Sequence, residues 1–273
     1  MKRKTLAIIS GSGRMPLIAA GAAKQAGHRV IAIAIEEAGG KPPRTADVRI
    51  VRSLLNGAGI VRALSEHQCD GVLFAGKFDK GMHNLDLSKV DEVSGAMLAR
   101  LPGRADMAIA TVVLEELEAR GFPPMSQLEA FSNNVAPQGL IAGPQMDPSR
   151  KGDVDLGLKV AGTVAAFDIG QTVVVRQGLV VAVEAAEHSD RCLRRAGRLV
   201  KGPMCVVKVA RPDQDFRFDT PVVGSRTLRT MYGIGADLLA IEAGRCLIMD
   251  RDFKKLAEEL RITVVGVKQR KRG

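Results

Sequence analysis

The sequence predicts an α/β protein of two domains, the first of which is built on a parallel sheet. Its 273 residues suit two domains of ordinary size better than one. Short apolar runs of strand length alternate with longer helix-like segments, which is typical of parallel strands joined by helices. A segment at 143–152 that contains two prolines and two glycines is the best candidate for a linker. We therefore place the domains at residues 1–146 and 147–273.

The first domain opens with a strand, a glycine turn and a helix. We expect a buried strand at 6–9, and Pro16 suits the first turn of the helix that follows because this residue has no N–H to lose. That helix is expected to end at Gln25, before a second buried strand at 30–35. Further elements are expected as a helix at 59–67, a strand at 71–75 and an amphipathic helix at 106–120. The last of these is expected to have Asp106 as its N-cap and Met107, Ile109, Val113 and Leu117 on its apolar face.

The second domain mixes hairpin strands with helices. Its basic helix is expected to begin at a capping Ser189 or Asp190. Its other helices are expected at 154–167, from Ser225 onward and at 253–260. Its strands are expected at 172–176, 179–185, 204–209, 238–241, 246–249 and 262–267.

The glycine turn of the first domain can receive a phosphate group. Gly11, Ser12 and Gly13 stand before a helix whose first N–H groups and dipole favour an anion. Lys77 follows the strand at 71–75, and the carboxyl ends of parallel strands meet at one edge of a sheet. We therefore expect Lys77 and the glycine turn to lie together.

A dinucleotide-binding turn is the alternative reading of the same residues. Glu36 stands at the end of the second strand, where an acid that binds ribose would lie. Pro16 occupies the position of the third glycine, so the fingerprint is incomplete. A turn with a purely structural role also stays open.

Composition restricts the class of ligand. The chain carries 40 Lys and Arg against 30 Asp and Glu, a formal charge of +10, which suits an anionic substrate. It has no Trp and one Tyr, so stacking of bases on aromatic side chains is not expected. The basic end of the chain either contacts anionic lipid or nucleic acid or is a solubilising frayed end. Its cations are Lys268, Arg270, Lys271 and Arg272.

Cysteine spacing and hydropathy indicate a cytoplasmic protein. The four cysteines lie far apart without a C-x-x-C pair, which argues against a zinc site and against a disulfide framework. The apolar run after the first basic residues is too short for a signal peptide, and no run is long enough for a membrane span. We expect a soluble or peripheral protein.

A charged loop at 206–224 is the strongest candidate for the chemistry. It follows an apolar strand and alternates cations with carboxylates: Lys208, Arg211, Asp213, Asp215, Arg217 and Asp219. Cations hold phosphate oxygens, and a carboxylate binds Mg²⁺ or accepts a proton from water. A second cluster combines carboxylates and arginines: Glu184, Glu187, Asp190, Arg194 and Arg195. Motifs of serine hydrolases, zinc proteases and P-loop enzymes are missing, and a solvated surface loop is the alternative.

Motifs along nearly the whole chain carry a resemblance to a known family. Those in the first half are Gly11-x-Gly13-x-x-Pro16, Phe74-Ala75-Gly76-Lys77, the helix start at Asp106, and Val135-Ala136-Pro137-x-Gly139. Those in the second half are Asp168-Ile169-Gly170-Gln171, Val183-Glu184-Ala185, Ser189-Asp190-x-x-Leu193-Arg194-Arg195, Lys208, Pro212, Gln214-Asp215, Arg217 and Asp219-x-Pro221-x-x-Gly224. With them the chain resembles the two-domain, metal-dependent UDP-2,3-diacylglucosamine pyrophosphatases of lipid A biosynthesis.

The resemblance implies a Rossmann-like N-terminal domain, a C-terminal α/β domain and Mg²⁺-dependent hydrolysis to UMP and 2,3-diacylglucosamine 1-phosphate. The family's essential aspartate corresponds to Asp219, predicted here as a metal ligand or the base that orients water. Asp190 is predicted as a second metal ligand, and Asp190 and Glu184 as supporting acids. Predicted substrate contacts are Gly11, Ser12, Gly13, Lys77, Gln171, Arg194, Lys208 and Arg217.

Three departures from the family pattern concern the fine details of the substrate. They are Ser12 within the first turn, Val222 where a hydroxyl residue is expected, and His188 where a smaller residue is usual. The implied partner is a UDP-linked diacylated amino sugar. No nucleic acid is expected, whereas peripheral contact with the inner membrane and a homodimer stay open. The competing functions are a nicotinamide-dependent oxidoreductase and a basic protein that binds membrane or nucleic acid.

Overall fold

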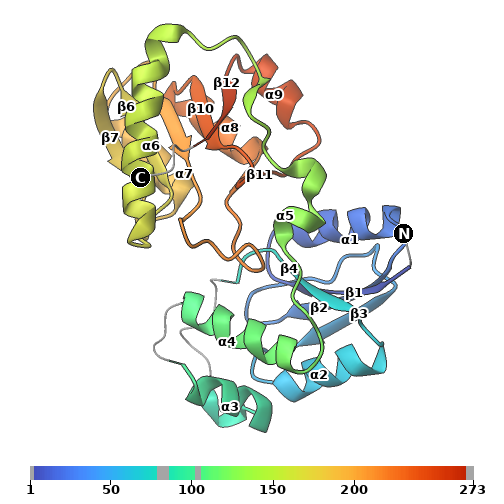
Figure 1. Cartoon of the computed structure of the whole chain (residues 1–273). Coiled ribbons are helices and arrows are strands. Elements are labelled where there is room, and N and C mark those ends of the chain that lie inside the picture. Colours follow the sequence, from blue (N-terminus) through green and yellow to red (C-terminus); the bar gives the residue numbers. More distant parts are fainter. Residues whose placement is uncertain (1–2, 79–85, 102–105, 269–273) are drawn as a thin grey trace. The chain divides into compact units, whose positions relative to one another are not determined.

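The computed structural model describes residues 3–78, 86–101 and 106–268, which form two compact α/β units (Figure 1). The first unit comprises Met1–Phe131 and Phe216–Phe218, and the second comprises Ser132–Asp215 and Asp219–Gly273. The predicted fold class, a parallel sheet in the N-terminal region and a second α/β sheet unit, is confirmed. The segment 143–152, expected as a linker, lies inside the second unit, because the strand before it pairs within that unit's sheet.

Four parallel strands form the sheet of the first unit in the order β3-β2-β1-β4. They are β1 (Thr5–Ser10), β2 (Arg29–Ile35), β3 (Val48–Arg52) and β4 (Gly71–Ala75). The direction of the strand order reverses at β1, since β2 and β3 lie on one side of it and β4 on the other. Ligands of open parallel sheets bind at the carboxyl ends of strands beside such a reversal.

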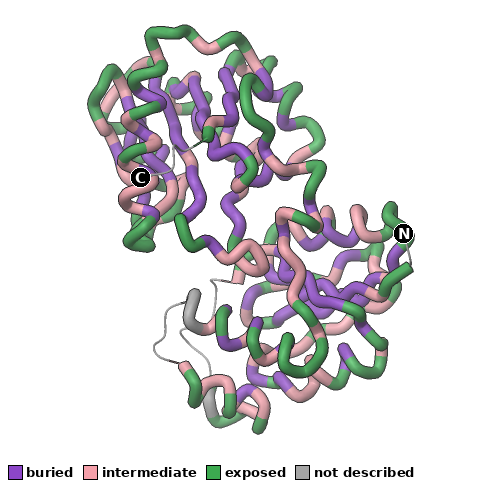
Figure 2. Tube along the Cα trace, viewed as in Figure 1, coloured by how far each residue is buried: buried purple, intermediate pink, exposed green. Residues whose placement is uncertain are grey.

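Three of these strands are buried on both faces, which explains their continuous apolar sequences (Figure 2). The helices of this unit are α1 (Met15–Gln25), α2 (Gly57–Glu66), α3 (Glu92–Ala99), α4 (Asp106–Ala119) and α5 (Gln127–Ala130), with a 3-10 turn η2 (Leu87–Lys89). On the predicted apolar face of α4, Leu117 is buried and Val113 packs half-buried against the core, whereas the buried Leu114 was not predicted. Sequence patterns did not predict β3, an edge strand that alternates half-buried and exposed residues, nor α3.

The second unit contains a mixed six-stranded sheet in the order β5-β12-β10-β8-β6-β7. Its strands are β5 (Gly139–Ala142), β6 (Thr172–Arg176), β7 (Leu179–Val183), β8 (Cys205–Lys208), β10 (Leu238–Glu242) and β12 (Thr263–Val267). The three central strands, β12, β10 and β8, are parallel. Strand β6 runs antiparallel to β8, and β7 antiparallel to β6, so the hairpin predicted at 172–185 forms one edge. Strand β5, at the other edge, runs antiparallel to β12.

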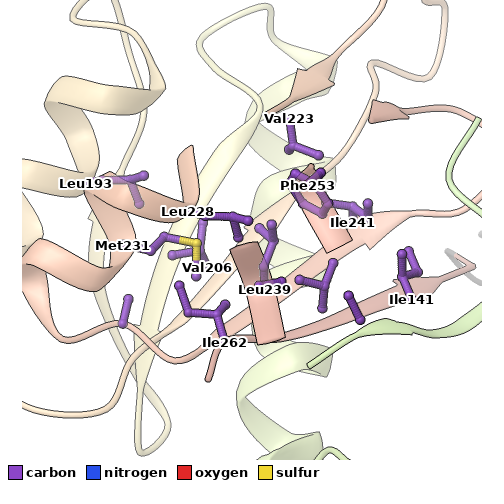
Figure 3. Packing of buried hydrophobic residues seen from close by; sticks show 14 of the residues in the cluster. Ile141, Leu193, Val206, Val223, Leu228, Met231, Leu239, Ile241, Phe253 and Ile262 are labelled. Carbon is purple, nitrogen blue, oxygen red and sulfur yellow. The ribbon is translucent and has the colours of Figure 1, made fainter. Parts of the chain in front are cut away.

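Helices cover both faces of this sheet, and alternate strand residues point to the two layers. Val206, Leu239 and Ile241 pack with α7 (Ser189–Leu199), α8 (Ser225–Ile234) and α9 (Phe253–Glu259) (Figure 3). Val207 and Ala240 pack on the other side with α6 (Lys151–Ala166). Two short 3-10 turns, η3 (Ser132–Asn134) and η4 (Pro148–Arg150), complete the helical elements described. The strict alternation is what a sheet buried on both faces requires.

Two local predictions for this unit were wrong. The N-cap of α7 is His188, at a positive φ of 67°, and Ser189 is the first helical residue, because its hydroxyl bonds to Glu184 instead of capping the helix. The run at 246–249 contributes β11 (Leu247–Ile248), which pairs with β9 (Val222–Val223) in a separate two-stranded sheet and does not join the main one. Among the described residues, no helix combines the length and the apolar character that crossing a bilayer requires.

We expect the four cysteine thiols to be unreactive in the folded protein. All are buried and free, and burial raises the pKa of Cys69 to about 11 and that of Cys192, Cys205 and Cys246 to about 12. Because the thiolate is the reactive form, we expect no reaction of the folded protein with Ellman's reagent at pH 8. All four should react after unfolding in guanidinium. Rapid labelling of a native thiol would contradict the packing described.

Candidate active site

The second unit gathers polar side chains at the carboxyl end of β8. Lys208 is the last residue of this strand, and Thr172, which begins the antiparallel β6, lies directly opposite it. Glu184 follows β7 at the same edge, because β7 runs antiparallel to β6. Antiparallel pairing thus brings residues that are far apart in the sequence to one edge of the sheet.

A hydroxyl links the lysine to the buried glutamate. The ammonium group of Lys208 donates to Ser189 Oγ at 2.7 Å, and Ser189 Oγ donates to Glu184 Oε1 at 2.9 Å. The hydroxyl of Thr172 lies 3.0 Å from the same Ser189 oxygen. Glu184 is 8% exposed, so its charge is compensated inside the protein. This network fixes the position of the Lys208 ammonium group.

Two glutamines continue the network toward Asp219. The backbone N–H of Gln171 donates to Glu184 Oε2 at 3.3 Å, and its side-chain amide donates to Gln214 Oε1 at 2.8 Å. The amide of Gln214 in turn donates to the backbone carbonyl of Asp219. The predicted site residues Glu184, Gln171, Lys208 and Asp219 are therefore connected by hydrogen bonds through Ser189 and Gln214.

A buried guanidinium lies between two exposed carboxylates. The Arg211 side chain, 8% exposed, donates to Asp168 Oδ1 and, at 3.4 Å, to Asp219 Oδ2. The side chains of Asp168 and Asp219 are 64% and 53% exposed. Asp219 thus has one oxygen toward its cation while half of its side-chain surface is open to solvent. A carboxylate held in this way can still bind a metal ion or a water molecule.

Backbone geometry restricts which residues can occupy the turn that contains Asp168 and Gly170. Asp168 has a positive φ of 53°, and a Cβ at Gly170 would lie 2.1 Å from the Glu184 carbonyl oxygen. At the start of the charged loop, Ala210 N–H donates to Glu242 Oε2 at 2.8 Å, and burial raises the pKa of the Glu242 carboxyl. The first contact shapes the turn that carries Asp168, and the second holds the residue before Arg211.

Other predicted residues have different partners. Asp190 pairs with Arg226 at 2.5 Å, and Arg217 pairs with Glu118 at 3.2 Å. Glu187 bonds to Arg195, which holds the pKa of the Glu187 carboxyl below its ordinary value. Arg194 lines a hollow of about 570 Å³ between α7 and α8. Among the described residues, Asp190 and Asp219 have different cationic partners, Arg226 and Arg211, and the pair stays a prediction as metal ligands.

The carboxylate oxygens at this edge suit a hard cation, but they do not surround a binding position for one. Within residues 3–78, 86–101 and 106–268, no three His, Cys, Asp or Glu side chains are grouped so that they could hold a metal ion. Asp168 and Asp219 share Arg211, and together with Lys208 and Glu184 these groups include more carboxylates than cations. Oxygen ligands of this kind match Mg²⁺, which often uses only one or two protein carboxylates together with water and substrate phosphates.

In the first unit, the predicted meeting of the glycine turn and Lys77 is confirmed. Ser12 and Lys77 exchange backbone hydrogen bonds of 2.9 Å in both directions, directly after β1 and β4. A Cβ at Gly11 would lie 2.2 Å from the Lys77 carbonyl oxygen, so only glycine fits there. The N–H groups of Gly11 and Ser12 bind the Ala75 and Lys77 carbonyls, so a phosphate would have to use N–H groups after Ser12.

Sequence reasoning did not single out Asp168, Ser189 or Gln214 as members of the site. Each of the three lies in a motif that the chain shares with the family it resembles. Membership of that motif was the signal available in the sequence. The partnership of Asp168 with Arg211 could not be derived, because it depends on how two loops meet in space. The basic residues Arg270, Lys271 and Arg272 lie outside the described residues.

Comparison with known families agrees with these motifs. The family model of the LpxI N-terminal domain matches residues 5–133, and that of the LpxI C-terminal domain matches residues 137–265. The chain belongs to the LpxI family. A relative from Caulobacter vibrioides, named UDP-2,3-diacylglucosamine pyrophosphatase LpxI, is 32% identical over 225 residues, which cover 78% of this chain and 80% of the relative. The resemblance stated from the sequence is therefore confirmed.

The similarity to solved structures is distant. N5-carboxyaminoimidazole ribonucleotide synthetase, in complex with ADP, is 18% identical with a TM-score of 0.27; the match covers 72% of this LpxI chain and 46% of the synthetase. An L-amino acid ligase from Bacillus licheniformis is 14% identical with a TM-score of 0.25; the match covers 68% of this chain and 41% of the ligase. The chain spans less than half the length of either protein, and similarity at this level carries no argument about function.

The steric contact at Gly170 predicts a strongly destabilising substitution. In Gly170→Ala the added methyl group would meet the Glu184 carbonyl, so we expect a loss of about 2 kcal/mol or more in the free energy of unfolding, measured in urea. The control is Gly152→Ala in α6, where nothing lies within 4 Å of the new Cβ. There alanine should be neutral or stabilise by up to about 1 kcal/mol. Equal effects of the two substitutions would contradict the close approach.

Proposed function

We propose that this protein hydrolyses the pyrophosphate bond of UDP-2,3-diacylglucosamine to UMP and 2,3-diacylglucosamine 1-phosphate. Family membership and the name of the Caulobacter relative support this substrate. The observation that carries the proposal in this chain is the exposed Asp219 carboxylate held against a buried Arg211. It lies on a loop that begins at the carboxyl end of β8, after Lys208. A diphosphate needs both kinds of group, cations for its oxygens and a carboxylate for the attacking water.

In the proposed reaction, water attacks the β-phosphorus and the bond from that phosphorus to the bridging oxygen breaks. The bridging oxygen leaves with the electron pair as part of UMP, and the water oxygen stays on the sugar 1-phosphate. Asp219 orients the water and accepts its proton. Lys208, fixed by Ser189, contacts phosphate oxygens and compensates the developing charge. Arg211 fixes Asp219 and is itself too buried to contact a substrate freely.

Magnesium dependence is part of the proposal. Asp219 would hold the ion, with Asp168 as the second carboxylate because it shares Arg211, and Asp190 as the ligand predicted from the sequence. When bound, a divalent cation withdraws charge from phosphoryl oxygens and makes a coordinated water more acidic. Mg²⁺ often binds one or two protein carboxylates together with water and substrate phosphates, so the ion would arrive with the diphosphate.

Contact with an anionic lipid surface is also proposed, through the exposed side of α7 and α8. Arg194, Arg226 and Arg229 line the hollow between these helices. Tyr232 and Leu199 expose 62% and 61% of their surface on the same two helices, as residues at a membrane interface do. A substrate and a product with two acyl chains would reside in such a surface. A homodimer stays a prediction.

The decisive experiment offers UDP-2,3-diacylglucosamine and Mg²⁺ and measures UMP. We expect Asp219→Ala to lower kcat by about 100-fold or more, because the water loses its proton acceptor. The matched control is Asp213→Ala, an exposed aspartate of the same loop, which should stay within about twofold. EDTA should abolish UMP formation, and added Mg²⁺ should restore it. The absence of UMP with the wild type would refute the proposed reaction.

Lipid contact predicts that vesicle binding depends on charge. We expect the protein to float with vesicles containing phosphatidylglycerol and not with pure phosphatidylcholine. Arg194→Ala/Arg229→Ala should weaken that binding about tenfold or more, since each cation near an anionic surface contributes about 1 kcal/mol. The control, Arg251→Ala/Lys254→Ala, removes two exposed cations outside α7 and α8. Equal loss in both variants would contradict a localised surface.

A further inference from the structure

The loop that carries Asp219 contains three residues that pack with the first unit. Phe216–Phe218 belong to that unit, although Asp215 and Asp219 on either side belong to the second. The Phe218 ring lies 5.7 Å from that of Phe74, in β4, and 5.5 Å from that of Phe78. Phe74 and Phe78 also contact each other at 5.9 Å. The residue bonded directly to Asp219 is thus anchored beside the end of β4.

One buried side chain ties this anchor to the strand. Gln127, the first residue of α5, is 1% exposed. Its side-chain amide donates to the carbonyl oxygens of both Phe74 and Phe218, at 2.9 Å each. Its backbone N–H donates to the Phe216 carbonyl at 2.7 Å. Both hydrogens of the amide are therefore used, one on β4 and one on the peptide before Asp219.

These bonds fix the orientation of one peptide plane. The Phe218 carbonyl and the Asp219 N–H belong to the same peptide group, which is planar. Its carbonyl accepts from Gln127, and its N–H donates to the Asp215 carbonyl at 3.3 Å. With both ends held, the direction in which Asp219 leaves the backbone is set. The carboxylate is then steadied at its far end by Arg211 and Gln214.

We propose that Gln127 is a positioning residue for Asp219: its amide holds the Phe218 carbonyl, and the peptide group of that carbonyl sets the direction in which the aspartate leaves the backbone. This inference rests on the proposed function for the role of Asp219. Gln127 itself touches neither the reacting atoms nor a phosphate. The two donors of its amide satisfy both carbonyls without burying a charge.

The test compares Gln127→Ala with Gln25→Ala, which alters an exposed glutamine at the end of α1. We expect Gln127→Ala to lower kcat about 30-fold while KM changes less than about threefold, because a misplaced group impairs the reaction more than binding. The control should match the wild type. Phe218→Leu, which keeps the carbonyl and an apolar side chain, should retain kcat within about threefold.

A second measurement does not depend on activity. Hydrogen exchange of a peptide that covers residues 216–221 should be faster in Gln127→Ala, while exchange in β8 stays unchanged. An unchanged kcat in a folded variant would overturn the inference, as would a loss accounted for by the unfolded fraction measured in urea. If the alanine variant does not fold, Gln127→Met replaces it with the same expected outcomes. Failure of the proposed function would show as absent UMP in the wild type, without any effect on hydrogen exchange.

Discussion

A buried positive charge that has to be neutralised constrains the polar edge of the second unit. Arg211 is almost completely enclosed, and an unpaired guanidinium in that position would cost several kcal/mol. Two aspartates from separate loops supply the compensation, and each keeps an exposed side. The positive φ of Asp168 and the close approach of Gly170 to Glu184 follow from this requirement, since they allow the first loop to reach the guanidinium. The same requirement keeps Asp219 in a single place.

Mixed strand pairing determines which residues can join that edge. In a purely parallel sheet only the residues after each strand meet there. Here β6 runs the other way, so Thr172 at its beginning lies opposite Lys208 at the end of β8. Glu184 and Ser189 then come from the connection between β7 and α7. The reversal therefore supplies the hydroxyl partner that binds the lysine and the carboxylate to which that hydroxyl donates.

Much of the fold could be predicted because its strands are buried on both faces and have continuous apolar sequences. Strands β1, β2 and β4 were found in this way. Two edge strands were missed: β3 intersperses arginine with Val and Ile, and β5 is only four residues long. The contact between Lys77 and the glycine turn was predictable because strand order alone brings the two together.

The residues of the candidate site could be named by type from the sequence, but the contacts between them could not. Asp219, Lys208 and Glu184 were named from charge and motif, and hydrogen bonds do connect them. Three features depend on how loops meet in space. Arg211 is buried, Ser189 bonds to Glu184 instead of capping α7, and Arg217 reaches Glu118. Local sequence patterns do not predict such contacts, since each of these residues is equally typical of a loop exposed to solvent.

The assignment of Phe216–Phe218 to the first unit has a consequence for how this protein can be divided. A fragment that starts at Ser132 would carry both phenylalanines without Phe74 and Phe78, and it would also lack the amide that caps the Phe218 carbonyl. The Phe218 ring would then lose both of its aromatic partners. The second unit is thus incomplete as a separate piece, even though its sheet and both helical layers are entirely its own.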